Sequence, residues 1–180
     1  LQSDWDEKKI VHIHLDIETA SPTAGPCQLS AIVVDPFTSR TLGEFYEYIN
    51  PGDDAIWSDE CTAVHKLHSN HPKIMKARPL VEVWAAFKAE VEQHLHGGAR
   101  LGMLVAWNGK GCDIEWFFKI TEVLHVGTCL PLEHTPYFWD PKHTISHYKT
   151  CPLNLKSAKM REQYGVGHPG YGLQHLWCKI

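Results

Sequence analysis

The chain has 180 residues, 43% of them hydrophobic, which suits one globular domain with a buried core. Its formal net charge of −4 argues against a protein that coats nucleic acid through charge alone, and no apolar run approaches the roughly 20 residues of a membrane helix. Six cysteines form no Cys-x-x-Cys pair, and the polar N-terminal extension, residues 1–8, does not resemble a signal peptide. We therefore expect reduced thiols, no membrane attachment and an intracellular protein, nuclear or cytoplasmic.

Three strands come first along the chain. Runs of apolar and β-branched residues predict strands over about residues 9–17, 28–34 and 41–49. The connections between them are short and contain Pro, Gly, Asp and Asn, the residues that turns favour. Three strands in series with short turns predict an antiparallel meander.

The pattern then becomes helical. Apolar residues follow a 3.6-residue period from Leu80 to Leu95, Pro79 suits the first turn, and Gly97-Gly98 ends the helix. Further elements follow in chain order: a strand over 101–107, a helix over 112–123, a strand near 137–139 and a helix over about 153–164. This order predicts an α/β fold in one domain over residues 9–180, with a mixed β-sheet of about five strands flanked by helices.

Two carboxylates lie at the end of the first predicted strand. Asp16 and Glu18 are one residue apart, so in a strand they point to the same face. Side by side they repel each other, and a divalent cation removes that cost; carboxylate oxygens suit Mg²⁺ or Mn²⁺. Taken alone, the pair also fits two solvated acids on an edge strand.

A third carboxylate follows a later strand. Asp113 comes after the strand over 101–107 and the turn Asn108-Gly109-Lys110-Gly111. In open α/β sheets active sites gather near strand ends, so we expect Asp113 to approach Asp16 and Glu18. An aspartate at the start of a helix also stabilises that helix by capping it and by complementing its dipole.

Two basic stretches interrupt the mildly acidic chain. No Asp or Glu stands between Glu60 and Glu82, or between Asp140 and Glu162, while lysines and arginines occur in both intervals. Such stretches fit a track for phosphates that leads to metal ions, and they equally fit solvated surface.

The ordered motifs resemble the DnaQ-like, or DEDD, 3′–5′ exonucleases. They are Asp-x-Glu-Thr at the end of the first strand, Gln28-Leu29-Ser30-Ala31-Ile32-Val33-Val34 as the second strand, and Asn-Gly-x-x-x-Asp about a hundred residues on. The form Leu-Val-Ala-Trp-Asn-Gly-x-x-x-Asp is most similar to the three-prime repair exonuclease branch. The exonuclease-like domain encoded with promyelocytic leukaemia protein is a second likeness, and the similarity covers about residues 9–165.

The resemblance implies a ribonuclease H-like fold. It implies hydrolysis of phosphodiester bonds at DNA or RNA 3′ ends, with release of nucleoside 5′-monophosphates, by two Mg²⁺ or Mn²⁺ ions. Asp16 would bridge both ions, Glu18 would ligate one and orient the attacking water, and Asp113 would hold the second. Paired cations stabilise the attacking and leaving oxygens of such a reaction.

The same resemblance implies a substrate side. The backbone at Thr19 and Ala20 would receive the terminal nucleotide, and His65 and Leu67 would pack against its base and sugar. Asn108 is a further substrate-side candidate, with turn formation in Asn-Gly as its other role. The implied partners are nucleic acid 3′ ends, with single strands favoured. DNA and RNA both stay open, because sugar discrimination depends on contacts near the 2′ position.

Two features depart from the family pattern. Trp107 stands where the repair branch often has a histidine, and the third motif, a late helix with a general-base His or Tyr and the fourth acid, is not found. After Asp140 the only acid is Glu162, so we expect the last helix to lie beyond Ile180. The alternative is a catalytically silent exonuclease-like module that binds nucleic acid or protein.

Histidine and cysteine spacings leave zinc as a third interpretation. His143-x-x-x-His147-x-x-x-Cys151 and His175-x-x-Cys178 have spacings that zinc ligands use. Without a Cys-x-x-Cys pair, surface or core histidines account for them better than a zinc-stabilised RNA-binding domain does.

Overall fold

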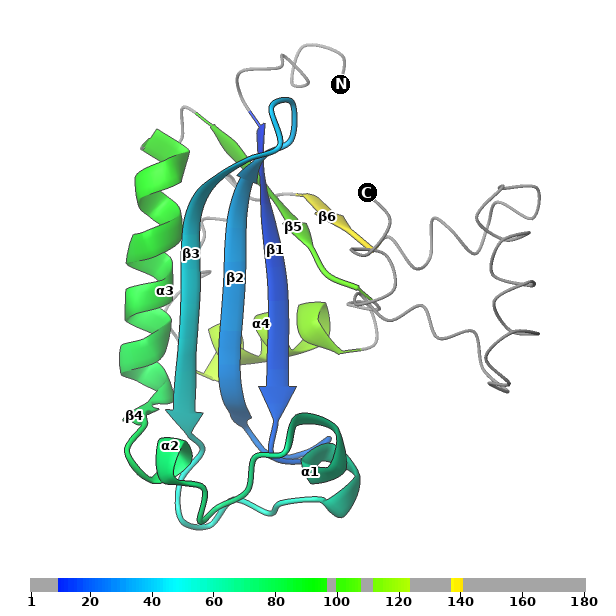
Figure 1. The fold of residues 1–180 in the computed structure, drawn as a ribbon, viewed down its shortest axis with the longest axis vertical. Helices are drawn as coiled ribbons and strands as arrows, with labels where there is room; N and C mark the ends of the chain where they lie inside the picture. Colours follow the sequence, from blue (N-terminus) through cyan, green and yellow to red (C-terminus); the bar gives the residue numbers. More distant parts are fainter. Residues whose placement is uncertain (1–9, 97–99, 108–111, 124–136, 141–180) are drawn as a thin grey trace, which may run out of the picture. The chain divides into compact units, whose positions relative to one another are not determined.

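The computed structural model describes residues 10–96, 100–107, 112–123 and 137–140 (Figure 1). The chain divides into two units between Trp139 and Asp140, and every helix and strand below belongs to the first unit. The helix expected over about residues 153–164 and the extension over residues 1–8 lie outside the described residues.

All five predicted strands are present. In chain order they are β1 (Ile10–Thr19), β2 (Pro26–Asp35), β3 (Arg40–Asn50), β5 (Leu101–Val105) and β6 (Tyr137–Trp139). A sixth strand, β4 (Arg78–Pro79), pairs in parallel with the end of β3 and was not predicted, since two residues show no periodicity. Across the described part of the sheet the order is β4-β3-β2-β1-β5-β6.

The pairing makes the sheet mixed, as predicted. β1, β2 and β3 form the antiparallel meander, while β5 runs parallel to β1 and β6 runs parallel to β5. Local turn chemistry joins the antiparallel strands: the Asp35 carboxylate accepts the N–H groups of Phe37 and Thr38 after β2. After β3, the Asn50 side chain accepts the N–H of Gly52, which has a φ of 97° that favours glycine.

Four helices accompany the described strands. The two predicted ones are α3 (Leu80–Leu95) and α4 (Asp113–Val123). Contrary to the prediction, Pro79 lies just before the first turn of α3, as its N-cap residue. Its backbone is extended, because Pro79 still pairs with β3 as part of β4. The unpredicted helices are α1 (Asp59–His65) and α2 (Pro72–Met75).

The short helices escape prediction because neither presents a long apolar face. α1 contains no buried residue, and α2 buries only Ile74. Both depend on local capping: the N–H of Cys61 bonds to Ser58 Oγ, and that of Lys73 bonds to His71 Nδ1. Figure 1 shows both short helices at the end of the sheet where β1 and β3 end.

The two faces of the sheet have different roles. Alternate residues of β1, from Val11 to Ile17, are buried against apolar side chains of β2, α3 and α4, and Figure 1 shows α4 crossing behind the strands. The intervening β1 residues His12, His14, Asp16 and Glu18 point to the opposite face. The sheet thus carries its core on one face and its polar residues on the other.

None of the described helices is long and apolar enough to span a bilayer.

Phe87→Ala is expected to lower the free energy of unfolding by about 3–5 kcal/mol. Its side chain is 0% exposed, and its ring lies 5.6 Å from that of Phe45 and 5.3 Å from that of Trp84, measured between centroids. Urea denaturation measures the loss. Val81→Ala, in the same helix but 53% exposed, should stay within about 0.5 kcal/mol of the wild type. Similar losses in both variants would contradict the assignment of the core.

Candidate active site

The Asp16–Glu18 pair lies at the C-terminal end of β1, on the open face of the sheet. Asp16 pairs across the strands with Ser30 of β2, and Glu18 pairs with Gln28. Asp16 is exposed and Glu18 is half-buried. The shared face follows directly from their spacing, and an irregularity in the strand comes only after Glu18.

Asp113 reaches β1 where β5 has stopped pairing with it. The parallel ladder between β1 and β5 runs from Ile10 to His14. Beyond it, the N–H of Ile17 donates to Asp113 Oδ1 over 2.7 Å, a buried hydrogen bond that joins residues 96 positions apart. The third carboxylate therefore lies beside the residue that separates Asp16 from Glu18. Asp113 is only 6% exposed.

The electrostatics of the three carboxylates oppose negative charge. Although Asp16 lies on the open face, partial desolvation by the surrounding protein raises the pKa of its carboxyl, and desolvation followed by repulsion from Asp16 raises the pKa of Glu18. Burial raises the pKa of Asp113 to about 6; repulsion from Asp16 and Glu18 adds to the rise, while the Ile17 N–H bond opposes it. A cation among these groups would remove both penalties.

The donor set suits Mg²⁺ or Mn²⁺, although the side chains are not preassembled around one ion. Among the described residues, no three His, Cys, Asp or Glu side chains form a group that could hold one ion. Mg²⁺ commonly keeps several waters and takes one or two carboxylates together with substrate phosphates. The fit therefore rests on oxygen ligands and on mutual repulsion that a cation relieves.

The backbone that follows the pair is held by α1. The N–H of Ser58 donates to the Ala20 carbonyl over 2.9 Å, and His65 Nε2 lies 3.1 Å from the Thr19 carbonyl oxygen. The N–H of Leu67 donates to His65 Nδ1, so Nδ1 is the unprotonated nitrogen and Nε2 carries the proton that Thr19 accepts. His65 thus ties the end of β1 to the end of α1.

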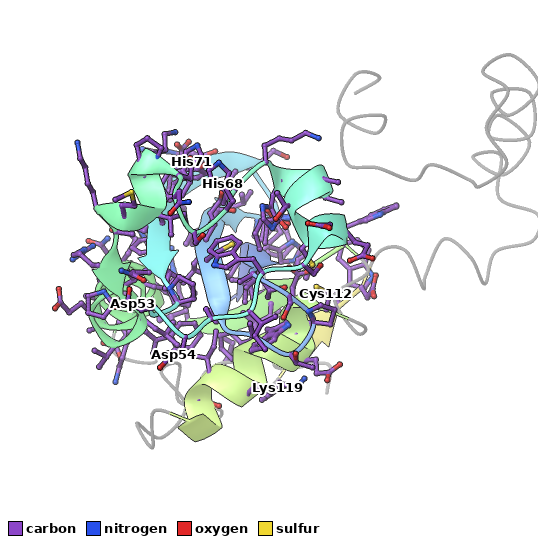
Figure 2. The ribbon with its side chains drawn as sticks, turned by 90° about the horizontal axis from the view of Figure 1, so that it is seen from below. Asp53, Asp54, His68, His71, Cys112 and Lys119 are labelled. Atoms are coloured by element: carbon purple, nitrogen blue, oxygen red, sulfur yellow. The ribbon has the colours of Figure 1, made fainter. Side chains whose placement is uncertain are left out.

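The remaining predicted residues are placed as follows. The side chain of Leu67 is buried in a small cluster with Cys27 and Ile74, and Asn108 lies outside the described residues. The cysteine and histidine pairs considered for zinc also lie outside the described residues. The same holds for the second basic stretch, which begins after Asp140. Figure 2, seen from the end of the sheet where β1 and β3 end, labels Cys112 at the start of α4 and the His68–His71 pair before α2.

Ser58 is a residue of the site that the sequence interpretation missed. It caps α1 and its N–H holds the Ala20 carbonyl. A serine followed by two acids, Asp59 and Glu60, is a local signal for a helix start that could have located it.

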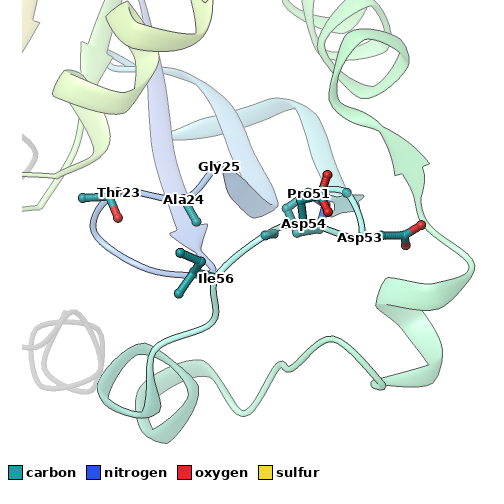
Figure 3. Close-up of a pocket in the computed structure, with 9 residues that line it drawn as sticks. Thr23, Ala24, Gly25, Pro51, Asp53, Asp54 and Ile56 are labelled. Atoms are coloured by element: carbon teal, nitrogen blue, oxygen red, sulfur yellow. The ribbon is translucent and has the colours of Figure 1, made fainter.

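A hollow of about 380 Å³ lies beside this backbone, between the loop after β1 and the segment after β3 (Figure 3). Its lining includes Thr23, Ala24, Asp53 and Asp54, and none of the three site carboxylates. Two aspartates at its rim make it a poor place for a phosphate, so it is not part of the candidate site.

Solved structures that resemble this chain include exonucleases. Exonuclease I bound to the inhibitor BCBP matches with a TM-score of 0.62 and 17% identity, over 81% of this chain and 31% of that one. E. coli exonuclease I with a 5cy-dT13 oligonucleotide gives 0.57 and 17%, over 74% and 28%. A 3′-exonuclease that recognises the 3′ end of a histone mRNA stem-loop gives 0.52 and 12%, over 63% and 41%.

The fold is ribonuclease H-like. This confirms the predicted fold class, including the mixed sheet and its flanking helices. No family model and no curated protein sequence matches the chain. The chain spans less than half the length of the three exonucleases above, and identity of this order establishes a shared fold alone.

The metal-free protein is expected to lose stability as the pH rises, and Asp113 is one cause. The pKa of this carboxyl is raised from 3.8 to about 6, so between these values the folded protein holds a proton that the unfolded chain has released. The free energy of unfolding should therefore fall from about pH 4 to about pH 6, with a contribution from Asp113 of at most about 3 kcal/mol.

Asp113→Asn isolates this contribution, because asparagine keeps an acceptor for the Ile17 N–H and carries no charge. Urea titrations in EDTA at several pH values should show a smaller fall for this variant than for the wild type. Glu44→Gln, which removes an exposed carboxylate of β3, should retain the full pH dependence. Parallel curves for wild type and Asp113→Asn would show that the carboxylate is not penalised by folding.

Proposed function

We propose that this chain is a metal-dependent 3′–5′ exonuclease domain that removes nucleoside 5′-monophosphates from DNA or RNA 3′ ends. The observation that carries the proposal is the hydrogen bond from the Ile17 N–H to Asp113, which brings a third carboxylate beside Asp16 and Glu18. The ribonuclease H-like fold shared with exonuclease I and a 3′-exonuclease supports it.

In this proposal each carboxylate has a separate task. Asp16 would contact both ions, Glu18 one of them, and Asp113 the other; when bound, the ions stabilise charge on the attacking and leaving oxygens. The Ile17 N–H favours the ionised form of Asp113, which is the form that binds a cation. The open face at Asp16 gives a phosphate access to the site.

The substrate side would be the backbone after β1. The Ser58 N–H and the His65 ring fix the Ala20 and Thr19 carbonyls, so this turn is held in one position before any ligand arrives. We propose that it receives the terminal nucleotide of a single strand. The neighbours in complexes include one with an oligonucleotide and one that recognises an mRNA stem-loop, so the proposal covers both sugars.

The same proposal includes membership of the DnaQ-like family and an intracellular location. It also includes one exonuclease-like domain over residues 9–180. Their support is the order of the motifs, from Asp-x-Glu-Thr at residue 16 to the aspartate at residue 113.

A second candidate function is a catalytically silent module that binds nucleic acid or protein. It is favoured by the finding that no three ligand side chains of the described residues are grouped around one ion position. Such a module would bind single strands without Mn²⁺ and without hydrolysis. Nucleic acid binding with no degradation in the presence of Mn²⁺, together with weak Mn²⁺ binding, would identify it.

Asp16→Asn is expected to slow Mn²⁺-dependent degradation of a single strand by more than about 100-fold, because loss of even an outer partner of a metal costs 10–100-fold. It should also weaken Mn²⁺ binding, measured by calorimetry, while the fold is retained. Because burial raises the pKa of Asp16, the metal-free variant should be at least as stable as the wild type at neutral pH.

Glu44→Gln is the matched control, since it removes a carboxylate from the same sheet face on β3. It should retain both Mn²⁺ binding and degradation. A strand blocked by a 3′-phosphate tests the direction of attack and should resist degradation. Cleavage by Asp16→Asn at the wild-type rate would discredit the proposed function.

A further inference from the structure

The face that carries the acid pair continues across the meander to two tyrosines. Asp16 pairs with Ser30, which pairs with Tyr46, and Glu18 pairs with Gln28, which pairs with Tyr48. Paired residues of neighbouring strands point to the same face. Two rows therefore cross β1, β2 and β3, each from a carboxylate to a tyrosine, over two strand spacings or roughly 10 Å.

A directional hydrogen-bond chain fixes these tyrosines. Lys73 Nζ donates to the Tyr48 hydroxyl over 2.8 Å, the two tyrosine hydroxyls lie 2.7 Å apart, and the Tyr46 hydroxyl donates to Gln28 Oε1 over 3.3 Å. Lysine only donates, and the single hydroxyl proton of Tyr46 is directed to Gln28, so the Tyr48 hydroxyl accepts from Lys73 and donates to the Tyr46 oxygen. The rings meet edge to face with centroids 5.3 Å apart. We call Tyr46, Tyr48 and Lys73 the tyrosine platform.

The platform is open and has positive charge at its outer end. The side chain of Tyr46 is 56% exposed, and Lys73 has no carboxylate partner among the ion pairs of the described residues. Lys66 and Lys76 lie in the same segment, in which no acid stands between Glu60 and Glu82. An exposed aromatic ring beside Lys73, a lysine without a carboxylate partner, suits a base and a phosphate.

The opposite charges at the two ends give the face a direction. Burial and the Tyr48 hydroxyl raise the pKa of Tyr46 to about 12, and Asp16 and Glu18 add to the rise, so the carboxylates act on this hydroxyl across the sheet. A strand with one phosphate at the metal-binding end would therefore find its next favourable phosphate contact at Lys73, past the tyrosines.

We propose that the tyrosine platform binds a nucleotide of a single strand upstream of its 3′ end, with the base stacked on Tyr46 and a phosphate at Lys73. This rests on the proposed function, because the 3′ end is taken to lie at the carboxylates. Duplex bases are already stacked on one another, so the platform selects unpaired strands. It selects no sequence, because every base has a face that stacks.

Tyr46→Ala tests the stacking contact. We expect it to raise the Kd for a fluorescein-labelled oligo-dT or oligo-rU of about 12 nucleotides, in EDTA, by at least about fivefold, within the range measured for base–aromatic stacking. Tyr46→Phe keeps the ring and should stay within about twofold of the wild type. Phe37→Ala removes another exposed aromatic ring, 49% exposed, from the turn at the other end of β2, and should leave the Kd unchanged.

Lys73→Gln tests the phosphate contact. Loss of one phosphate contact should make the negative slope of log K against log salt concentration shallower by about 0.7 for a single strand. Urea midpoints of all variants establish folding. If Tyr46→Ala unfolds, Tyr46→Leu and Lys73→Gln supply the test, since both keep a long side chain on the face. An unchanged Kd and salt slope in the folded variants would overturn the platform.

The outcomes separate the platform from the catalytic proposal. If Asp16→Asn stops degradation while Tyr46→Ala binds and degrades as Phe37→Ala does, the platform is wrong and the nuclease stands. If Tyr46→Ala loses binding while Asp16→Asn still degrades strands, the platform stands and the nuclease assignment fails. If Tyr46→Ala instead abolishes self-association in sedimentation without altering oligonucleotide binding, the face joins two copies of the chain and the platform is overturned.

Discussion

The hydrogen bond between the Ile17 N–H and Asp113 is the interaction on which the candidate site depends. β5 stops pairing with β1 at His14, so the Ile17 N–H lies beyond the reach of the ladder. A buried N–H without a partner costs about 1–3 kcal/mol, and Asp113 supplies the acceptor. The same bond fixes the start of α4 against β1. An asparagine would satisfy this N–H equally well, without the repulsion that Asp16 and Glu18 exert on a carboxylate. The charge itself complements the dipole of α4, which Asp113 begins, and the proposed cation would offset the repulsion.

The alternation of side chains along β1 separates stability from chemistry. Residues such as Ile13 and Ile17 are buried against α3 and α4, and Asp16 and Glu18 point away from that core. A polar change on the open face therefore leaves the packing of the core intact. Register extends this separation across the meander, because the partners of the acid pair on β2 and β3 must share its face.

The sequence predicts long elements and adjacent residues well, and contacts between distant segments poorly. Five strands and two helices follow from periodicity, and the shared face of Asp16 and Glu18 follows from their spacing. α1 and α2 have seven and four residues and too few buried positions for a periodic signal. The rows that end at Tyr46 and Tyr48 depend on strand register, which one sequence does not reveal. The tie from His65 to Thr19 spans 46 positions and also exists only in three dimensions.

The rigid sheet explains how several groups, each of which binds a ligand weakly, could act together on one strand of nucleic acid, as proposed. The acid pair, the backbone at Thr19 and Tyr46 all lie on a sheet whose other face is packed against two helices. Their separations are therefore set by strand spacing and change little when a ligand arrives. The conformational entropy lost on binding then falls mainly on the ligand, and a flexible single strand can adjust to fixed contacts. The proposed cation would add to this arrangement, because its binding would relieve the repulsion among the three carboxylates at the same end of the sheet.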